Sequence, residues 1–349
     1  MKRIKEKKFQ RTKELSHSYS SNSPELVQKQ KAKAREKIEK EWPEKNLSKI
    51  LDKMMEVYDT CGDLSHLGEE RNLPSKEAIV RILDDFIVLL FPTFLAETKL
   101  TKANIRYFTG DTLHSLYTRL VQEVNKSLEY VCRRVKECPS DICKIRAQTV
   151  ARELLENIPT IKELLARDIQ AAYNGDPAAK SYEEIVLSYP CLYAIAAYRV
   201  SHELYVREVP LVPRIMSEHA HCMTGVDIHP GARIGKNFFI DHGTGVVIGE
   251  TTEIGDNVRI YQGVTLGGQR LGSSDVSKLR GKKRHPTIED DVIIYAGATI
   301  LGGKTVVGKG TVIGGNVWIT SSIPSNTTVA IAPPRLSYRH QDPKNACAT

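Results

Sequence analysis

Three short motifs in the second half of the chain combine histidine with aspartate or arginine. They are VDIHP, IDHGTG and KRHP, which contribute Asp227, His229, Asp241, His242, Arg284 and His285. A histidine oriented by a carboxylate is a general base for a hydroxyl group, because its pKa lies near physiological pH and the carboxylate fixes its tautomer. The sequence has no serine or cysteine in a nucleophile-elbow pattern. These residues favour direct transfer of a group to an activated hydroxyl over a covalent enzyme intermediate.

The motifs lie in a stretch where aliphatic residues recur every six to eight positions. These anchors are Ile234, Ile240, Ile248, Ile254, Ile260, Leu266, Ile288, Ile294, Ile300, Val307, Ile313 and Ile319. A sustained six-residue period is the signature of a parallel β-helix, in which the aliphatic residue points inward and a following small residue permits the corner. Twelve anchors at three per turn predict about four coils.

The repeat breaks at two places. The stretch IDHGTGVVI carries two extra residues, and the interval 267–287 is rich in glycine, serine, lysine and arginine, which predicts a loop outside the coil. Insertions in a solenoid lie on its surface, often on the binding face. A lone histidine is more often structural, but three histidine sites clustered at repeat breaks favour a site for chemistry.

The region before the repeat has helical spacing. From Asn46 to about Leu204 the apolar residues recur at i, i+3, i+4 and i+7, as in the segments 79–90 and 113–135. Two further helical segments are predicted near 147–172 and 182–205, separated by the turn sequence NGDPAAK. Helix ends or kinks are predicted at Pro92, Pro139 and Pro159.

Composition describes a soluble globular protein, with 41% hydrophobic and 26% charged residues in 349. The longest apolar stretch, 79–91, is far shorter than the roughly 20 residues of a membrane span. Residues 1–42 hold 13 Lys/Arg and 6 Asp/Glu (13 − 6 = +7), almost all of the net charge of +8. This predicts a solvated basic arm rather than a nucleic-acid-binding domain, because interleaved aromatic residues are lacking.

The cysteines predict a reducing compartment. Their number, seven, is odd, they show no CxxC spacing, and the basic start of the chain is not followed by the apolar region of a secretory signal, so we expect free thiols in the cytoplasm. Cys132 lies on the apolar face of a helical pattern near Cys138 and Cys143, which favours burial over a metal cluster. His219 and His221 form a His-x-His pair that we interpret as a surface pair at a helix end.

Longer stretches closely resemble the serine O-acetyltransferase family of hexapeptide-repeat acetyltransferases. They are VDIHPGARIG, FFIDHGTGVVIGETTEIGDNV, YQGVTLGG, KRHPTIEDDVIIYAGATILGG and VIGGNVW, together with the helical DIQAAYNGDPAAK. The resemblance covers about residues 160–325 and implies an α+β fold: an N-terminal all-helical domain followed by a left-handed parallel β-helix. It also implies transfer of acetyl from acetyl-CoA to the hydroxyl of L-serine, the first step of cysteine biosynthesis, with no metal.

The resemblance implies roles for particular residues. It makes His242 the general base and Asp227 the carboxylate that orients it, with His285 as the third catalytic residue. The substrate-binding residues that it implies are Asp176, Asp241, Arg284 and His285. On the acetyl-CoA side it implies contacts at Gly268, Ala296 and Gly297, and Lys304 and Lys309 are candidates for the CoA phosphates because lysine is a cation.

Domain boundaries follow from these patterns. We expect a basic arm, partly disordered or helical, over 1–45, a helical domain over 46–213, a β-helix over 214–325 and a tail over 326–349. The resemblance further implies a homotrimer or a dimer of trimers, and L-cysteine as a feedback inhibitor. The chain ends KNACAT rather than in the isoleucine with which family members enter O-acetylserine sulfhydrylase, so that complex is not expected.

Three alternatives stay open. A related acetyltransferase that acts on a sugar or another hydroxyl acceptor would use the same coil and base, although NGDP, DIHP and RHP together favour an amino acid. A γ-class carbonic anhydrase would bind zinc through three histidines, here His229, His242 and His285. A non-catalytic β-helix scaffold would bind no CoA.

Overall fold

The computed structural model describes residues 24–60, 73–135, 140–269, 281–332 and 337. The chain divides into two compact units, 1–71 and 72–349. In the first unit the described element is one long helix, α2 (Pro24–Thr60), which runs through position 45, where the arm was expected to end. The second unit holds the helical region and the β-helix.

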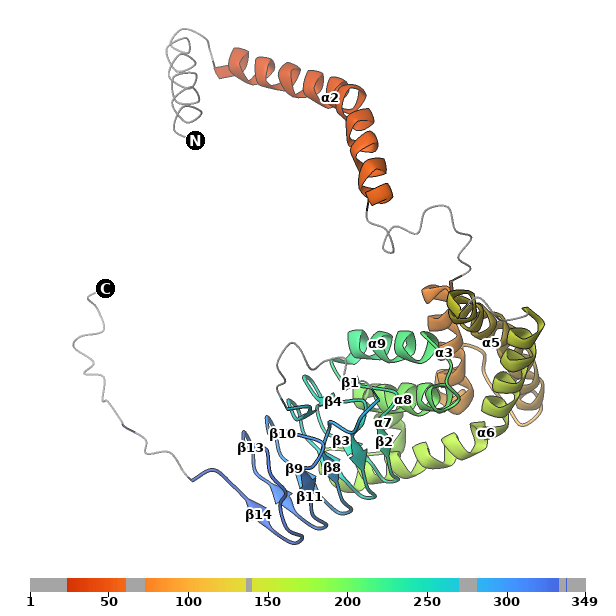
Figure 1. Cartoon of the computed structure of the whole chain (residues 1–349), viewed down its shortest axis with the longest axis vertical. Helices are drawn as coiled ribbons and strands as arrows, with labels where there is room; N and C mark the ends of the chain where they lie inside the picture. The colour runs from red at the N-terminus through yellow and green to blue at the C-terminus, as the bar shows by residue number, and fades with distance from the viewer. Residues whose placement is uncertain (1–23, 61–72, 136–139, 270–280, 333–336, 338–349) are drawn as a thin grey trace. The chain divides into compact units, whose positions relative to one another are not determined.

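Seven helices follow in the second unit (Figure 1). They are α3 (Lys76–Leu90), α4 (Pro92–Leu95), α5 (Ile105–Val135), α6 (Ser140–Gly175), α7 (Tyr182–Ser188), α8 (Pro190–Val206) and α9 (Val212–Thr224). The segment predicted as one helix over 182–205 is two helices, because Pro190 has no N–H to continue α7 and instead begins α8. Helix α9 extends the helical region eleven residues beyond position 213 (224 − 213 = 11).

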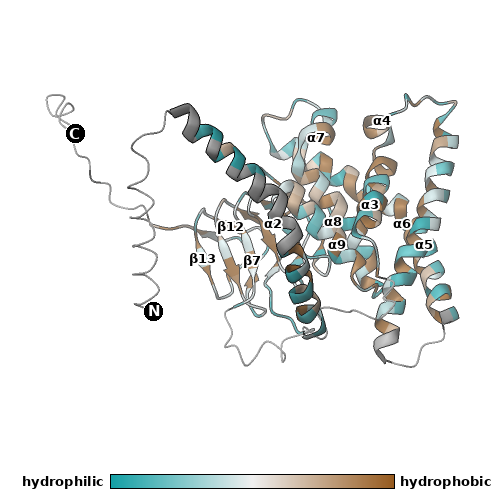
Figure 2. Ribbon diagram, turned by 90° about the horizontal axis from the view of Figure 1, so that it is seen from above, coloured by the Kyte–Doolittle hydropathy of each residue, from teal (hydrophilic) through white to brown (hydrophobic). Residues whose placement is uncertain are grey.

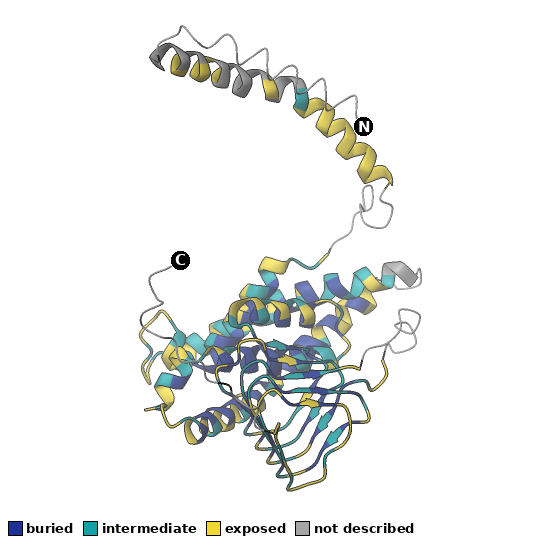
Figure 3. Cartoon of the chain, turned by 90° about the vertical axis from the view of Figure 1, so that its left-hand side faces the viewer, coloured by how far each residue is buried: buried dark blue, intermediate teal, exposed yellow. Residues whose placement is uncertain are grey.

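The apolar positions of the helical pattern form the core between the helices (Figure 3). In α3, Ile79, Ile82 and Phe86 are fully buried, as the spacing predicts. Val131 in α5 is instead 41% exposed, so the buried stripe of that helix ends before its last turns. Pro159 lies inside α6 rather than at a helix end. Figure 2 shows that these helices carry both hydrophobic and hydrophilic residues.

Cys132 and Cys143 lie close together between α5 and α6. Cys143 is buried, Cys132 is half-buried, and their Sγ atoms are 3.3 Å apart. Cys138 lies outside the described residues. The contact agrees with the interpretation of these cysteines as packed thiols.

The second half forms the predicted left-handed parallel β-helix. Its strands are β1 (Asp227–Ile228), β2 (Arg233–Ile234), β3 (Phe239–Ile240), β4 (Val247–Ile248), β5 (Glu253–Ile254), β6 (Arg259–Ile260), β7 (Thr265–Gly267), β8 (Thr287–Ile288), β9 (Ile293–Ile294), β10 (Thr299–Leu301), β11 (Val306–Val307), β12 (Val312–Ile313), β13 (Trp318–Ile319) and β14 (Thr328–Val329). Strands β1 to β13 enter three parallel sheets in turn, and β14 joins the third. The sheets have the orders β1-β4-β7-β10-β13, β11-β8-β5-β2 and β14-β12-β9-β6-β3, here named sheets A, B and C.

The anchors stack on one another inside the coil. Ile248, Leu266 and Ile300 are register neighbours in sheet A, and all three are buried. Sheets A and C have five strands each, so the coil has five levels rather than about four, because Ile228 and Val329 extend the repeat at its two ends. Strand β8 follows β5 in sheet B after the interval 267–287, of which residues 270–280 lie outside the described part.

A ladder of short polar side chains supports the corner between sheets B and C. Asn237, Asn257 and Asp291 have φ of 56°, 59° and 59°. The Asn237 side-chain amide donates to Asn257 (2.6 Å), and that of Asn257 donates to Asp291 (2.8 Å). Asparagine and aspartate tolerate the left-handed conformation better than other non-glycine residues. The repeat therefore needs these residue types at this corner.

A buried ion pair joins the helices to the coil. Arg199 of α8 donates to both carboxylate oxygens of Asp168 in α6, at 2.7 and 3.0 Å. The Phe238 N–H also donates to Asp168, and Arg199 donates to the carbonyl of Gly235. Breaking a buried pair of this kind costs about 3–5 kcal/mol. The first coil is thus held firmly against α6 and α8, which places the end of α6 beside it.

In the described residues, no helix is long and apolar enough to cross a membrane.

Candidate active site

The turn that carries His242 links β3 of sheet C to β4 of sheet A. His242 itself has a φ of 57°, and Gly243 and Gly245 have φ of 78° and 79°. Left-handed backbone is costly for residues other than glycine, and such strain is concentrated at functional sites. A Cβ on Gly243 would lie 2.4 Å from the Sγ of Cys191 in α8. The two glycines that interrupt the apolar run therefore allow a tight turn that presents His242, whose side chain is 69% exposed.

Two aspartates accompany this histidine. The His242 Nδ1 lies 3.6 Å from the Asp241 Oδ1. Asp176 follows α6, and its carboxylate accepts hydrogen bonds from the Tyr189 hydroxyl and from the Ala178 N–H (2.8 Å). The hydrogen bond from Tyr189, then that from Ala178, holds the pKa of Asp176 below its ordinary value, and the charge of His242 acts in the same direction. Asp176, Tyr189, Asp241 and His242 are called the His242 cluster below.

Arg259 fixes the end of α6 over this cluster. Its Nη1 donates to the carbonyl of Gly175 at 3.0 Å, and its guanidinium lies 5.7 Å from the ring centroid of Phe239. A Cβ on Gly175 would lie 2.7 Å from the Arg259 Nη2, so only glycine fits there without movement. Because Asp176 is the next residue, Arg259 acts on its position through the backbone.

Asp227 lies directly under the same turn. It is the first residue of β1, and its N–H donates to the carbonyl of Val246 at 2.9 Å. Ile228 points into the coil, so the half-buried Asp227 side chain points outward, as strand alternation requires. Among the described residues, the carboxylate that lies within 4.0 Å of a His242 ring nitrogen is that of Asp241 rather than that of Asp227. The orienting role of Asp227 therefore stays a prediction.

A second group of polar residues lies where sheet A turns into sheet B. Arg284 forms an ion pair with Glu250, whose other oxygen accepts a hydrogen bond from the Tyr205 hydroxyl at 2.7 Å. Burial acts to raise the pKa of Glu250, but these two hydrogen bonds hold it below its ordinary value. The Nη1 of Arg284 is buried and has no hydrogen-bond partner among the described residues.

His285 is fixed in the same group. Its ring is buried, and its Nδ1 accepts a hydrogen bond from the Thr251 N–H at 3.1 Å. Burial, and next the Arg284 charge, lowers the pKa of His285 to about 4. The ring is therefore neutral at pH 7, with its proton on Nε2. A Cβ on Gly249 would lie 2.1 Å from the His285 Cδ2, so the glycine makes room for the ring.

His229 completes this group one level away. Its Nδ1 accepts from the Gly231 N–H at 2.9 Å, and its ring packs edge-on against Tyr205 with centroids 5.5 Å apart. Burial, followed by the charge of Arg214, lowers its pKa to about 4. These contacts support a structural role for His229. The Arg284 cluster below means Tyr205, His229, Glu250, Thr251, Arg284 and His285.

The two clusters lie at different corners of the three-sided coil. The His242 cluster lies at the corner where sheet C meets sheet A, and the Arg284 cluster lies where sheet A meets sheet B. One chain therefore presents a histidine with carboxylates at one corner and an arginine with histidines at another. The predicted site residues fall into two groups rather than one.

The candidate acetyl-CoA residues divide in the same way. Ala296 and Gly297 lie at the corner of the His242 cluster, whereas Gly268 and Lys304 lie at the corner of the Arg284 cluster. Lys309 lies at the third corner, where its Nζ is 3.7 Å from Asp290 Oδ2 and 3.3 Å from Asp291 Oδ2. Its charge is already paired, which makes it the weakest of the five candidates.

In the part of the chain that the structure describes, no group of three or more His, Cys, Asp or Glu residues is placed to hold a metal. His242 lies at a different corner from His229 and His285, so one copy of the chain does not bring these three imidazoles together. His221 lies 3.5 Å from Glu218, and His219 packs on the ring of Tyr193.

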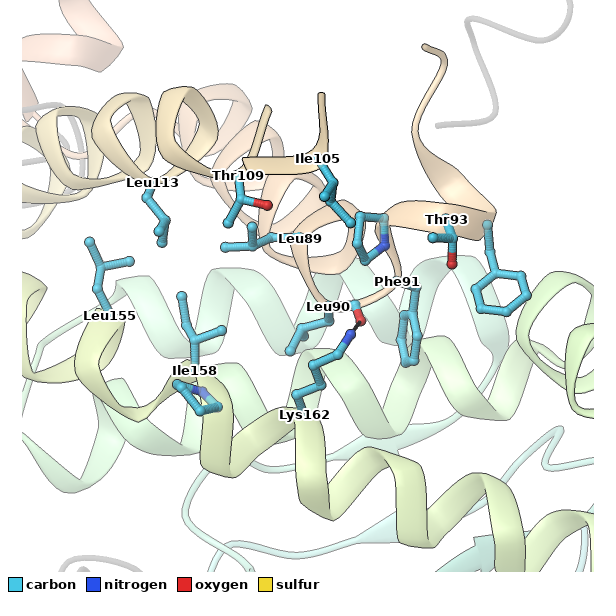
Figure 4. A pocket seen from close by; sticks show the side chains of 13 residues that line it. Leu89, Leu90, Phe91, Thr93, Ile105, Thr109, Leu113, Leu155, Ile158 and Lys162 are labelled. Atoms are coloured by element: carbon cyan, nitrogen blue, oxygen red, sulfur yellow. Dashed lines mark hydrogen bonds between the residues drawn. The ribbon is translucent and has the colours of Figure 1, made fainter. Parts of the chain in front are cut away.

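An apolar cavity of about 500 Å³ lies among the helices, away from both clusters (Figure 4). It is lined by residues of α3, α4, α5 and α6, including Leu90, Ile105 and Ile158. Lys162 reaches its edge and donates to the carbonyl of Leu90, and burial lowers the pKa of this lysine. The amine thus satisfies a carbonyl at the C-terminal end of α3.

This fold and these clusters define a class, the hexapeptide-repeat acyltransferases. A serine acetyltransferase of Synechococcus elongatus is 45% identical over 263 residues, which is 74% of this chain and 82% of that protein. The serine acetyltransferase of Bacillus subtilis is 48% identical over 173 residues, 50% of this chain and 76% of that protein. No family model matches the chain.

Solved structures agree with the sequence relatives. Serine acetyltransferase isoform 3 of Entamoeba histolytica, crystallised in complex with cysteine, superposes with a TM-score of 0.62 at 36% identity over 74% of this chain and 84% of that one. Serine acetyltransferase 1 of the same organism, in complex with L-cysteine, has a TM-score of 0.62 at 35% identity over 79% and 95%. The chain belongs to the serine acetyltransferase family and is an acyltransferase.

Four residues of the two clusters escaped the sequence analysis: Tyr189, Tyr205, Glu250 and Thr251. Arg259, which ties the end of α6 beside the His242 cluster, escaped it as well. Glu250 ends the motif VVIGE. An acidic residue next to a corner glycine was a signal in the sequence that could have identified it as a site residue. Both tyrosines come from the helical region and reach the coil only through packing of α7 and α8. Arg259 reads as an ordinary outward-facing strand residue.

Proposed function

We propose that the chain transfers the acetyl group of acetyl-CoA to the hydroxyl of L-serine, giving O-acetyl-L-serine and CoA. The exposed His242 takes the hydroxyl proton while the serine oxygen attacks the thioester carbonyl carbon. The new C–O bond forms, the C–S bond breaks, and the proton passes from His242 to the leaving thiolate. Asp227, under the His242 turn, orients the ring and stabilises its charged form. The transfer is direct, without an acetylated enzyme.

Recognition of serine uses both clusters. The carboxylates of Asp176 and Asp241 are suited to the substrate ammonium. The hydrogen bonds that hold the pKa of Asp176 below its ordinary value keep this carboxylate charged in more acidic solution than an ordinary aspartate. The Nη1 of Arg284 has no hydrogen-bond partner among the described residues and is a donor suited to the substrate carboxylate. His285 adds an Nε2–H donor beside it. Glu250 and Tyr205 hold Arg284 in place as positioning residues.

The separation of the clusters supports a site shared between copies of the chain. A closed trimer sets one corner of each copy against another corner of the next, in a heterologous contact. The outer face of sheet A, between the two corners, exposes Val247 and Trp318, and Tyr295 is exposed beside it. We therefore propose a homotrimer in which His242 of one copy faces Arg284 of a neighbouring copy.

Acetyl-CoA is the co-substrate in this proposal. The pantetheine arm runs between the two corners that meet in the proposed trimer, past Gly268 at one corner and Ala296 and Gly297 at the other. The absence of large side chains there lets backbone N–H groups approach the thioester oxygen. Lys304 is exposed at the same corner as Gly268 and suits a CoA phosphate. Lys309 is a second candidate cation for a CoA phosphate.

L-cysteine is proposed as a feedback inhibitor that occupies the serine site, supported by the cysteine bound to the Entamoeba histolytica enzyme. We further propose a cytoplasmic location, in keeping with the odd number of cysteines and their lack of CxxC spacing.

The observation that carries the proposal is the exposed His242 in a strained turn, beside two carboxylates, in a chain of this family. The test is thiol release from acetyl-CoA by the purified chain with L-serine, with a sugar acceptor, or with no acceptor. Serine-dependent release is expected. Release with the sugar alone would replace serine by another acceptor, and no release with any acceptor would overturn the acetyltransferase assignment.

The shared site has its own test. Two inactive variants, His242→Ala and Arg284→Ala, are unfolded together in equal amounts and refolded, with each variant refolded alone as control. Three quarters of random trimers are then mixed, and each mixed trimer has one intact site of three, so about a quarter of wild-type activity returns. Sites contained within one copy would give no recovery.

A further inference from the structure

The cavity of about 500 Å³ between α3, α4, α5 and α6 is lined mostly by apolar side chains. Figure 4 shows those of Leu89, Leu113 and Ile158 turned toward its open space. Protein interiors are close-packed, and voids larger than a water molecule are few. The pockets of proteins that hold a small organic ligand have volumes of roughly 300–1,000 Å³. This cavity is therefore large enough to hold such a molecule.

Two prolines interrupt the helices that form the wall of this cavity. Pro92 has no N–H to continue α3, so that helix ends at Leu90 and the short helix α4 begins at Pro92. Pro159 lies inside α6 and also lines the cavity. It has no N–H for the carbonyl of Leu155, and its ring crowds that carbonyl. The sequence itself therefore disfavours continuous helices on two sides of the open space.

One charged side chain, that of Lys162, lies at the edge of the cavity. The other polar side chains that line it are those of Thr93 and Thr109. In the described part of the chain the Lys162 ammonium, which has three N–H donors, donates to the carbonyl of Leu90 alone. Burial lowers the pKa of Lys162, and no carboxylate of the described residues opposes that effect. The cavity therefore combines an apolar volume with a partly buried positive charge that has further N–H groups to donate.

This combination selects the chemistry of a ligand. A carboxylate can accept from the remaining Lys162 donors and neutralise the charge. An aliphatic tail can replace water on Leu113 and Leu155, and each CH₂ that leaves water strengthens binding by about fourfold. A sugar or a nucleotide would instead leave polar groups unpaired among these side chains. We propose that the cavity binds a linear aliphatic monocarboxylic acid, with its carboxylate at Lys162 and its tail between α3, α5 and α6.

The first test compares probes that share one tail and differ in the head group. Isothermal titration of the full-length chain should show saturable, stoichiometric binding of dodecanoate. Dodecanol and dodecyltrimethylammonium should bind roughly tenfold or more weakly, because neither can neutralise the Lys162 charge. Decanoate, which is two methylenes shorter, should bind about 15-fold more weakly than dodecanoate. The absence of saturable dodecanoate binding, or equal affinity for the three head groups, would overturn the proposal.

Variants of the cavity then locate the bound probe. Lys162→Met keeps an aliphatic stem but removes the charge, so dodecanoate should bind about 10- to 100-fold more weakly while dodecanol binding stays the same. Lys144→Met, which removes an exposed lysine of the same helix, is the matched control. Thr109→Trp fills the cavity from a half-buried position and should abolish binding of both probes. Wild-type dodecanoate affinity in Lys162→Met or in Thr109→Trp would place the probe elsewhere and contradict the proposal.

The cavity lies away from the His242 and Arg284 clusters, so this proposal does not depend on the acetyl transfer reaction. Serine-dependent CoA release, measured on the same wild-type samples, tests the proposed function separately. Dodecanoate binding without CoA release would overturn the proposed function alone, and CoA release without dodecanoate binding would overturn the cavity proposal alone.

Discussion

The His242 and Arg284 clusters use the same residue types in opposite ways. At the corner of sheets C and A, His242 is 69% exposed on a left-handed turn. At the corner of sheets A and B, His229 and His285 are buried or half-buried, accept hydrogen bonds from backbone N–H groups and have pKa values lowered to about 4. A general base must gain and lose a proton, whereas a histidine that serves as a fixed hydrogen-bond donor must keep a single protonation state. Exposure and backbone strain therefore separate the proposed base from the fixed histidines.

The clusters also differ in what holds them. Asp176 depends on the end of a helix, tied by Arg259 and Tyr189, whereas Arg284 depends on Glu250, which follows a strand of the same coil. In the proposed site, helix packing and coil stacking must therefore both be correct before serine can be bound. The following predictions test this division, from the largest expected effect to the smallest.

Replacing His242 should remove nearly all activity. We expect His242→Ala to lower turnover by about 10²–10⁴, the usual contribution of a general base, and to leave the trimer intact. Steady-state thiol release and sedimentation measure the two properties. The control is His221→Ala, which removes another exposed histidine paired with a carboxylate, and should leave turnover unchanged. Near-normal turnover of His242→Ala would refute its role.

Replacing Arg284 of the Arg284 cluster with lysine should weaken serine binding. Arg284→Lys keeps the charge but loses the planar fork, so we expect KM for serine to rise about 10- to 100-fold, equivalent to a charge-assisted hydrogen bond of roughly 1.5–3 kcal/mol. KM for acetyl-CoA should stay near its wild-type value. The control Arg233→Lys alters an exposed arginine at the edge of the coil. Equal changes in both KM values would point to general damage instead.

Removing the Tyr189 hydroxyl should raise the pH below which serine binding weakens. Tyr189→Phe deletes the main cause of the low pKa of Asp176, so this pKa should rise towards its ordinary value. KM for serine should rise about fivefold, from loss of roughly 1 kcal/mol, and the fall of kcat/KM on acidification should begin at higher pH. Tyr182→Phe, which removes a hydroxyl bonded to Gln170, is the matched control. An unchanged pH profile would detach Asp176 from serine binding.

The buried histidines should make stability depend on pH. Because their folded pKa values of about 4 lie below the unfolded value of 6.5, the unfolded chain binds more protons between these limits. The free energy of unfolding should therefore be constant above about pH 6.5 and fall between pH 6.5 and 4. Urea unfolding of wild type and His285→Asn measures this. The variant should show a shallower fall, and an identical slope would contradict the assignment.

Much of the coil could be predicted because its information is local. Each anchor of the hexapeptide repeat forms its own strand and contacts its equivalents one level away, so a period in the sequence becomes a stack in space. The break at IDHGTG was also readable, because glycines beside a histidine fit a strained turn. The helices were less certain at their ends. Pro190 divides α7 from α8 because it has no N–H to continue α7, whereas α9 continues to Thr224 and packs against α8.

The sequence by itself determined the repeat, the residue types at its breaks and the resemblance that names the family. Tertiary structure alone decided that Tyr189 holds Asp176 near the His242 turn, and that Glu250 and Tyr205 hold Arg284. It also decided that the two clusters lie at different corners. The reason is physical. A six-residue period fixes which corner a residue occupies only within the coil, whereas helical residues 45 to 83 positions away reach the site through packed surfaces (259 − 176 = 83; 250 − 205 = 45).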